Sequence, residues 1–115
     1  MRPRRGASSL DRRIAVERAT EGAANGFGEP SVTWSEIATL WAAREDVSDA
    51  EKVAAGQRDT ARLSRFVVRS SADTRAITSA DRLVHDGATW EIKGVKETRD
   101  GRQRFLEITA VTDSD

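Results

Sequence analysis

The chain has 115 residues, a mass of 12.6 kDa and a formal net charge of +0, with 19 Lys and Arg balanced by 19 Asp and Glu. This length accommodates one domain, and the charge balance argues against a dedicated nucleic-acid-binding protein, which usually carries a basic excess. Cysteine is absent, which excludes a disulfide framework, a thiolate zinc site and a cysteine nucleophile. No apolar run is long enough to span a bilayer, and the basic N-terminus lacks the apolar segment of a secretory signal. We therefore expect synthesis in the cytoplasm and no membrane partner.

Charge is segregated along the chain despite the overall balance. Residues 1–18 contain six arginines against two acidic residues, whereas residues 112–115 carry only acidic charge. Such terminal clusters are typical of solvated segments. We expect a basic flexible arm over 1–9, a single β-barrel domain over 10–111 and an acidic tail over 112–115.

The first expected strand lies near residues 12–18, where Ile14 and Val16 share one face and charged residues occupy the alternate positions. The following segment, residues 19–30, contains three glycines, an Asn-Gly pair and a proline. These residues favour turns and interrupt regular structure, so they predict a long loop.

A second strand region is expected over 32–43. Val32 and Trp34 share one face, and Thr39 and Trp41 also share a face, but an odd number of residues separates the two sets. A regular strand would place the sets on opposite faces. We expect a bulge, or a break into two strands, near residues 35–37 to absorb this change of phase.

A short helix is expected over about residues 49–58. Ser48 and Glu51 have the spacing of a capping box, in which each side chain accepts a hydrogen bond from the backbone N–H of the other residue. The apolar face behind this cap consists mostly of alanine, and Gly56 weakens it. Such a helix suits a light packing contact or a subunit interface.

The second half of the chain is expected to consist of strands joined by short turns. Asp86-Gly87 and Asp100-Gly101 are each typical of a two-residue hairpin turn, because glycine tolerates positive φ. Residues 61–69 favour a strand, whereas the polar residues 70–75 favour a loop. The two hairpins are expected over 81–93 and 94–111.

Antiparallel strands in this order predict a mainly β fold, a small antiparallel β-barrel or sandwich with one short inserted helix. Trp34, Trp41 and Trp90 are large apolar groups for so small a domain. We expect at least two of them in the core and the third as an interface anchor, since tryptophan is enriched at interface hot spots. Phe66 and Phe105 are also expected to pack in the core.

No residue pattern points to catalysis. His85 precedes a predicted turn, where we expect a solvated residue rather than a general base, because a base needs a partner within hydrogen-bond reach. Asp46, Asp49 and Glu51 lack the spacing of a calcium loop, and no phosphate-binding glycine motif is present. We therefore expect no enzyme activity, no cofactor and no metal ion.

The residues alone leave two alternatives open. Arg62, Arg65 and Arg69 recur along one expected strand. With the N-terminal arginine cluster, they could form a small β-barrel module that binds nucleic acid by neutralising phosphates. A small hydrolase would depend on His85 and on scattered carboxylates.

The order of four segments resembles the head–tail joining proteins, also called head-closure or stopper proteins, of tailed phages and gene transfer agents. Residues 10–18 resemble the opening strand of that family, and Gly-Glu-Pro-Ser-Val-Thr-Trp at 28–34 resembles its Gly-Glu-Pro-x-x-x-Trp segment. Ile-Ala-Thr-Leu-Trp-Ala-Ala at 37–43 resembles its Ala-Thr-Val-Trp-Ala run. Residues 82–92 resemble its hairpin, Arg-Val-x-x-x-Gly-x-x-Tyr/Trp-x-Ile. The basic N-terminal extension, the acidic tail and Arg65 depart from the family pattern.

The resemblance implies a small β-barrel protomer without enzyme activity, which assembles into a homo-oligomeric ring of six- or twelve-fold symmetry in the neck of a phage-like particle. The ring would lie between the portal or adaptor ring and the tail terminator or tail tube, and it would gate the passage of DNA. Neighbouring copies in such a ring make heterologous contacts, in which oppositely charged patches can meet.

Candidate interface or channel residues follow from this expectation. We expect the segments over 19–31 and 47–59 to contact adjacent rings or the channel. The candidates are Arg2, Arg4, Arg5, Phe27, Glu29, Trp41, Ser48, Glu51, Lys52 and Arg58.

Overall fold

The computed structural model describes residues 10–24, 26–48, 56, 61–98 and 105–113. Six strands and one short helix occupy most of these residues. In chain order they are β1 (Arg12–Ala24), β2 (Pro30–Asp46), β3 (Ala61–Arg69), α2 (Ala72–Arg75), β4 (Arg82–His85), β5 (Ala88–Glu97) and β6 (Phe105–Asp113). The predicted fold class, mainly β with a short helix, is confirmed.

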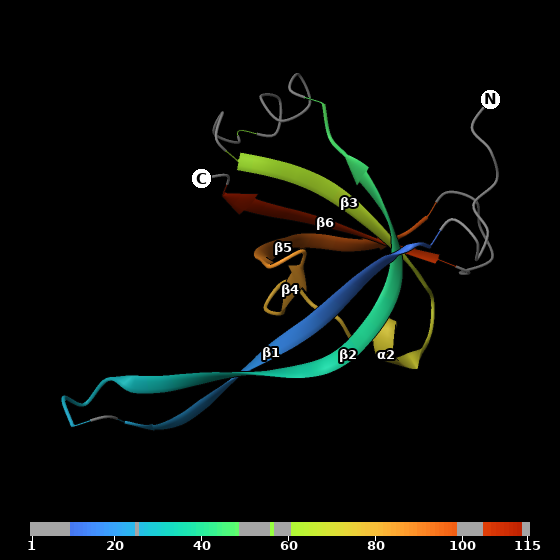
Figure 1. Ribbon diagram of the computed structural model, residues 1–115. Coiled ribbons are helices and arrows are strands. Elements are labelled where there is room, and N and C mark those ends of the chain that lie inside the picture. The colour runs from blue at the N-terminus through green and yellow to red at the C-terminus, as the bar shows by residue number, and fades with distance from the viewer. Residues whose placement is uncertain (1–9, 25, 49–55, 57–60, 99–104, 114–115) are drawn as a thin grey trace, which may run out of the picture.

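The strands form one antiparallel sheet that closes into a barrel-like ring in the order β1-β2-β3-β6-β5-β4, although the ring is not evenly round an axis (Figure 1). β3 and β6 pair along their whole length. β1 and β4, in contrast, are joined only from Ala15↔Val84 to Glu17↔Arg82. The barrel is therefore extensively paired on its β3–β6 side and narrowly closed on its β1–β4 side.

Alternate side chains of every strand fill the barrel interior, as the period of two requires. Ile14 and Val16 are almost fully buried, and so are the predicted core residue Phe66 and the alternating positions of β5 and β6. The Trp90 ring packs edge-on against Phe66, with ring centroids 5.2 Å apart. The sequence periodicity therefore identified the inward face of these strands correctly.

Two further apolar clusters cover the outer face of β3 and β6. Phe105 and Val67 pack with Leu10 and Ala43 at one end of these strands. At the other end lies a cluster made of Val47, Ala61, Leu63 and Val111. β3 is consequently buried on both faces along most of its length, which explains the run of consecutive apolar residues at 66–68.

β1 and β2 continue past the barrel as a two-stranded arm, here called the β1–β2 arm, which comprises residues 18–36 (Figure 1). The long loop predicted over 19–30 is therefore wrong, because β1 extends to Ala24 and β2 begins at Pro30. Ladder pairing joins the two strands of the arm even though nearly all of their side chains are exposed. At roughly 3.3 Å per residue, each strand of the arm is about 20 Å long.

The bulge predicted near residues 35–37 is confirmed. Val16 pairs with Ala38 and Glu17 pairs with Glu36, so Ile37 is an extra residue on β2. This irregularity brings Trp34 and Trp41 onto the same outer face of β2, although seven positions separate them in the printed sequence.

The hairpin turn predicted at Asp86-Gly87 is also confirmed, since His85 pairs with Ala88 and the two turn residues have φ values of 51° and 74°. We expect Gly87→Ala to lower the free energy of unfolding by about 1 kcal/mol, because an L side chain disfavours positive φ. Gly94→Ala is the matched control, because neither position has an atom within 4 Å of an added Cβ and Gly94 lacks positive φ. Urea unfolding of both variants tests this, and equal losses would contradict it.

A one-turn helix, α2, replaces the loop predicted over 70–75. Ser71 accepts a hydrogen bond from the Thr74 backbone N–H, and the Thr74 hydroxyl accepts one from the Ser71 backbone N–H, so the two residues form a capping box. Thr74 also donates to the Arg69 carbonyl at 3.0 Å, which ties α2 to the end of β3. The predicted helix over 49–58 and the turn at Asp100-Gly101 lie outside the described residues, apart from Gly56.

Candidate functional site

The inner side of the β1–β2 arm is fastened to the barrel by a bidentate ion pair. Arg18 donates from Nε and Nη2 to the two carboxylate oxygens of Asp81, at 2.9 and 3.1 Å, and Nη2 also reaches the Ala76 carbonyl at 3.0 Å. The Asp81 side chain is 1% exposed, whereas that of Arg18 is 45% exposed. The arm is thus anchored through a buried carboxylate that the segment between α2 and β4 supplies.

Burial is the largest single influence on the pKa of Asp81, and it acts to raise that pKa because a buried carboxylate loses hydration. The hydrogen bonds from Arg18 and from the Thr78 backbone N–H, together with the charge of Arg18, act in the opposite direction and outweigh burial. The pKa of Asp81 is therefore lowered. Asp81 is ionised at neutral pH, and the anchor is a charged one.

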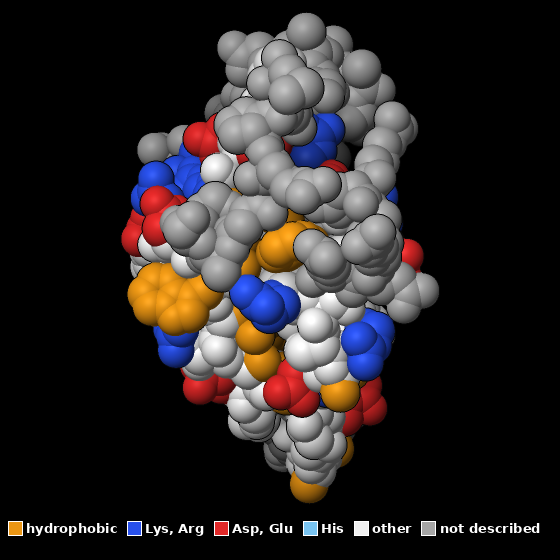
Figure 2. Space-filling model, turned by 90° about the vertical axis from the view of Figure 1, so that its right-hand side faces the viewer, with side chains coloured by type: hydrophobic (Ala, Val, Ile, Leu, Met, Phe, Trp, Pro, Cys, Tyr) orange, Lys and Arg blue, Asp and Glu red, His pale blue; other side chains and the backbone are white. Residues whose placement is uncertain are grey.

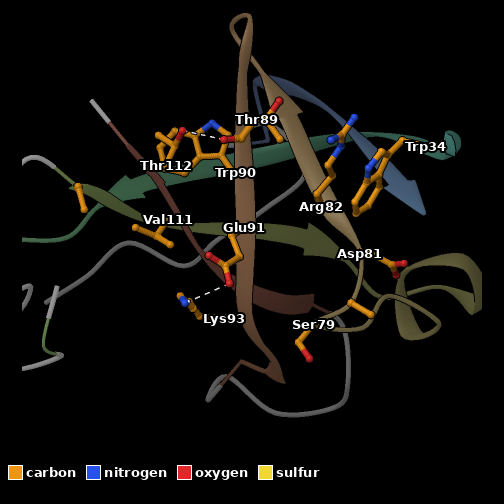
Figure 3. Close-up of a pocket in the computed structure, with 12 residues that line it drawn as sticks. Trp34, Ser79, Asp81, Arg82, Thr89, Trp90, Glu91, Lys93, Val111 and Thr112 are labelled. Carbon is orange, nitrogen blue, oxygen red and sulfur yellow. Dashed lines mark hydrogen bonds and ion pairs between the residues drawn. The ribbon is translucent and has the colours of Figure 1, made fainter. Parts of the chain in front are cut away.

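A second contact fastens the outer side of the arm. Arg82 donates to Glu17 at 2.7 Å, and its guanidinium lies over the Trp34 ring, 4.1 Å from the ring centroid. Figure 3 shows Arg82 stacked beside Trp34 at the edge of a depression of about 620 Å³, with Asp81 directed to the other side of the chain. Two consecutive residues of β1 thus form ion pairs with two consecutive residues where β4 begins. Glu17 pairs with Arg82, and Arg18 pairs with Asp81.

The arm and β2 carry exposed apolar side chains. Among the described residues, the large hydrophobic side chains that are exposed are Phe27 (92%), Val32 (52%), Ile37 (39%) and Trp41 (55%). Phe27 lies in the turn at the tip of the arm, and the other three follow one another along β2. Large apolar side chains that are exposed on a protein surface are candidate contacts for a partner.

A groove of about 690 Å³ lies at the end of the molecule opposite to the arm tip, where β2, β3 and α2 meet. Its lining includes Leu10, Thr39, Leu40, Trp41, Val68 and Thr74. Arg69 also lines the groove, and the Arg13 guanidinium lies 4.7 Å from the Trp41 ring centroid. Figure 2 faces this end and shows hydrophobic side chains bordered by Lys and Arg side chains. We refer to this feature as the β2–α2 groove.

The predicted interface residues fall in three places. Phe27 and Glu29 lie at the arm tip, Trp41 lies in the β2–α2 groove, and Ser48 is exposed just after β2. The structure does not bring these three places together. The remaining candidates lie outside the described residues, namely Arg2, Arg4, Arg5, Glu51, Lys52 and Arg58.

Two predictions about single residues are wrong. His85 is 4% exposed rather than solvated, its Nδ1 lies 3.0 Å from the Arg13 carbonyl oxygen, and its ring packs against Phe66. Of the three tryptophans only Trp90 is in the core, at 1% exposed, whereas Trp34 is partly buried beneath Arg82. The chain therefore places more aromatic surface outside the barrel than we expected.

The three arginines of β3 do not form one basic face. The Arg62 guanidinium lies 5.4 Å from the Trp90 ring centroid, on the inner side of the strand. Arg65 and Arg69 have the opposite parity, and Arg65 pairs with Glu107 at 3.2 Å. Because side chains alternate between the two faces of the strand, the three arginines do not form the single basic face that the nucleic-acid-binding alternative requires.

The described residues hold no cluster of three or more His, Asp and Glu side chains that could bind a metal ion. No helix within these ranges is long and apolar enough to cross a membrane. Sequence reasoning missed Arg18, Asp81 and Arg82, which hold the arm. The available signal was the pair of charged dipeptides, Glu-Arg at 17–18 and Asp-Arg at 81–82, whose opposite charges meet when the strands pair antiparallel.

Comparison with known proteins adds a family assignment to this geometry. A family model described as phage head completion protein matches residues 6–113. A chain of the solved structure "Virion of native gene transfer agent (GTA) particle" is 26% identical, with a TM-score of 0.64 and 97% of each chain covered. Protein SF1141 from Shigella flexneri 2a is 22% identical with a TM-score of 0.67, covering 92% of this chain and 95% of that one, and it shows a shared fold.

No curated protein sequence matches the chain. The family match is nonetheless nearly complete, because it spans both the β1–β2 arm and the whole of the barrel. It also agrees with the resemblance found in the sequence. The chain belongs to the phage head completion protein family.

Proposed function

We propose that the protein forms a homo-oligomeric ring in the neck of a phage-like particle, between the portal or adaptor ring and the tail, and that this ring gates the passage of DNA. Family membership makes the chain a structural component of the head–tail region of such a particle. Formation of a ring, its position in the neck and its gating of DNA go beyond the family assignment, and these are what we propose.

The β1–β2 arm is the observation that carries this proposal. It contributes almost nothing to the barrel core, yet it presents the exposed apolar side chains of Phe27 and Val32. An isolated domain gains no stability from such a surface, whereas a subunit buries it against a neighbour. A projecting arm meets a different part of the next copy, which is the heterologous contact that generates rings.

The distribution of charge supports a channel through which DNA passes without being held. Five described arginines pair with carboxylates, in the ion pairs Arg12–Asp11, Arg18–Asp81, Arg44–Asp46, Arg65–Glu107 and Arg82–Glu17. Paired arginines release few counterions on meeting phosphate, so they contribute little to DNA affinity. A low affinity suits a conduit better than a dedicated DNA-binding module.

Sedimentation velocity and negative-stain electron microscopy of the purified chain, alone and with the portal complex, test this proposal. We expect ring-shaped oligomers that bind the portal complex, and weak binding to a labelled double-stranded oligonucleotide at physiological salt. A strictly monomeric protein that does not bind the portal complex would contradict the proposal. Tight oligonucleotide binding that weakens steeply with salt would instead favour the nucleic-acid-binding alternative.

A further inference from the structure

The arm tip and the β2–α2 groove lie at opposite ends of one molecule (Figure 1). Phe27 is a projecting aromatic side chain, 92% exposed, and the groove offers about 690 Å³ of mostly apolar space beside Trp41. Cavities of this size accommodate large apolar groups. The tip cannot fill the groove of its own chain, because β2 separates Leu40 from Phe27 by about 35 Å of extended strand.

The two surfaces also have opposite charge. Residues 19–36 of the arm include Glu21, Glu29 and Glu36 and no lysine or arginine. Arg13 and Arg69 are exposed beside the groove. Complementary potentials of this kind favour association and fix its orientation.

We propose that the arm tip of one copy, centred on Phe27, docks in the β2–α2 groove of a second copy. This inference rests on the ring proposed above and identifies the segments that join its subunits. Each copy then supplies one tip and one groove, so the contact repeats head to tail around the ring. Docking buries the exposed faces of Phe27 and Trp41 in one contact.

Disulfide trapping tests the contact directly, because the natural chain has no cysteine. One population carries Gly26→Cys, next to Phe27 at the arm tip, which leaves the Phe27 side chain in place. A second population, bearing a larger tag, carries Thr39→Cys in the groove. Mixed and oxidised at concentrations where microscopy shows rings, they should give a tip-to-groove heterodimer. The matched control replaces Thr39→Cys by Lys96→Cys, which is exposed on β5 and away from the groove. We expect at least a tenfold excess of the Thr39 product over the Lys96 product.

The possible results distinguish failure of the docking proposal from failure of the ring proposal. Rings with equal trapping at both positions would overturn the docking and leave the ring intact. No rings and no trapping at millimolar protein would overturn both. Trapping that appears only after deletion of residues 1–9 would show that the chain's own N-terminal segment occupies the groove, and this too would overturn the proposal.

A second measurement avoids introduced cysteines. Phe27→Ala should weaken self-association about 30-fold, as expected for an aromatic anchor at an interface hot spot. Phe27→Leu, which keeps an apolar side chain at the tip, should weaken it several-fold less. Because Phe27 lies outside the core clusters, neither variant should change the unfolding of the monomer. Unchanged association of Phe27→Ala would contradict the docking.

Discussion

Trp90→Ala will lower the free energy of unfolding by about 4 kcal/mol, which is the largest effect that we expect from a single substitution. The Trp90 side chain is 1% exposed, and it packs on Phe66 while the guanidinium groups of Arg44 and Arg62 lie 5.1 and 5.4 Å from its ring centroid. Its removal would leave a cavity in a small barrel and would deprive both arginines of the aromatic face that they cover. Denaturant unfolding at a concentration where the protein is monomeric measures the loss.

Trp41→Ala is the matched control, because it removes the same side chain from a site that is 55% exposed. We expect it to lower the stability of the monomer by less than about 1 kcal/mol and to weaken self-association. If Trp90→Ala does not fold, Trp90→Phe can be measured instead, because it keeps an aromatic ring in the core. We expect its loss of unfolding free energy to lie between the losses expected for Trp41→Ala and Trp90→Ala. Equal losses for Trp41→Ala and Trp90→Ala would contradict the assignment of the core.

Asp81→Asn will cost about 2 kcal/mol of stability at neutral pH, because it removes the charged acceptor of the hydrogen bonds from Arg18 and Thr78. We place this value below the usual cost of breaking a fully buried pair because the Arg18 side chain is 45% exposed. The loss should be concentrated in the arm. Hydrogen exchange of β1 and β2 residues within 18–36 should accelerate, while exchange in β3 and β6 should change little.

The contribution of Asp81 should depend on pH with a definite sign. The pKa of Asp81 is lowered in the folded protein, so its stabilising effect is fully present above the ordinary carboxyl pKa. This stabilising effect is lost as the pH falls through the lowered pKa that Asp81 has in the folded protein, because protonation of Asp81 removes its ion pair with Arg18. The difference between the natural chain and Asp81→Asn should therefore shrink towards zero in strong acid. Asp11→Asn, at a carboxylate that is 74% exposed, is the control and should leave the free energy of unfolding at neutral pH nearly unchanged.

The predictions that succeeded depended on information local to the chain. The phase change around Ile37 and the Asp86-Gly87 turn are visible in a few residues, because side-chain period and positive φ are local properties. The buried faces of β5 and β6 could be predicted from the same alternation of side chains between the two faces of a strand. Sequence reasoning was therefore reliable for the buried faces of β5 and β6.

The β1–β2 arm was missed because it buries almost no side chains. Residues 19–24 are small or polar and lack apolar alternation, so periodicity has nothing to detect. Ladder hydrogen bonds, together with the Ser31 hydroxyl that donates to the Ala23 carbonyl at 2.8 Å, join the two strands of the arm. Its two charged anchors hold it to the barrel. His85 was misplaced for a related reason, because its position before a turn did not show that Phe66 of β3 packs against its ring inside the barrel.

The candidate site could be predicted only in part. Phe27 was a candidate because it lies in the segment over 19–31 that was expected to contact neighbouring rings, and Trp41 was a candidate because tryptophan is enriched at interface hot spots. The β2–α2 groove could not be predicted, because Leu10, Val68 and Thr74 come from three separate segments that meet only in the folded chain. The same holds for Arg18 and Asp81, which are 63 positions apart.

The bulge at Ile37 lies where the arm leaves the barrel, and bulges bend a strand and increase its local twist. In the ring that we propose, the direction in which the arm leaves the barrel determines how far each copy is rotated relative to the copy before it. A ring closes only when that rotation divides a full turn into a whole number of steps. One extra residue on β2 would then set the angular step, and with it the number of subunits and the diameter of the channel.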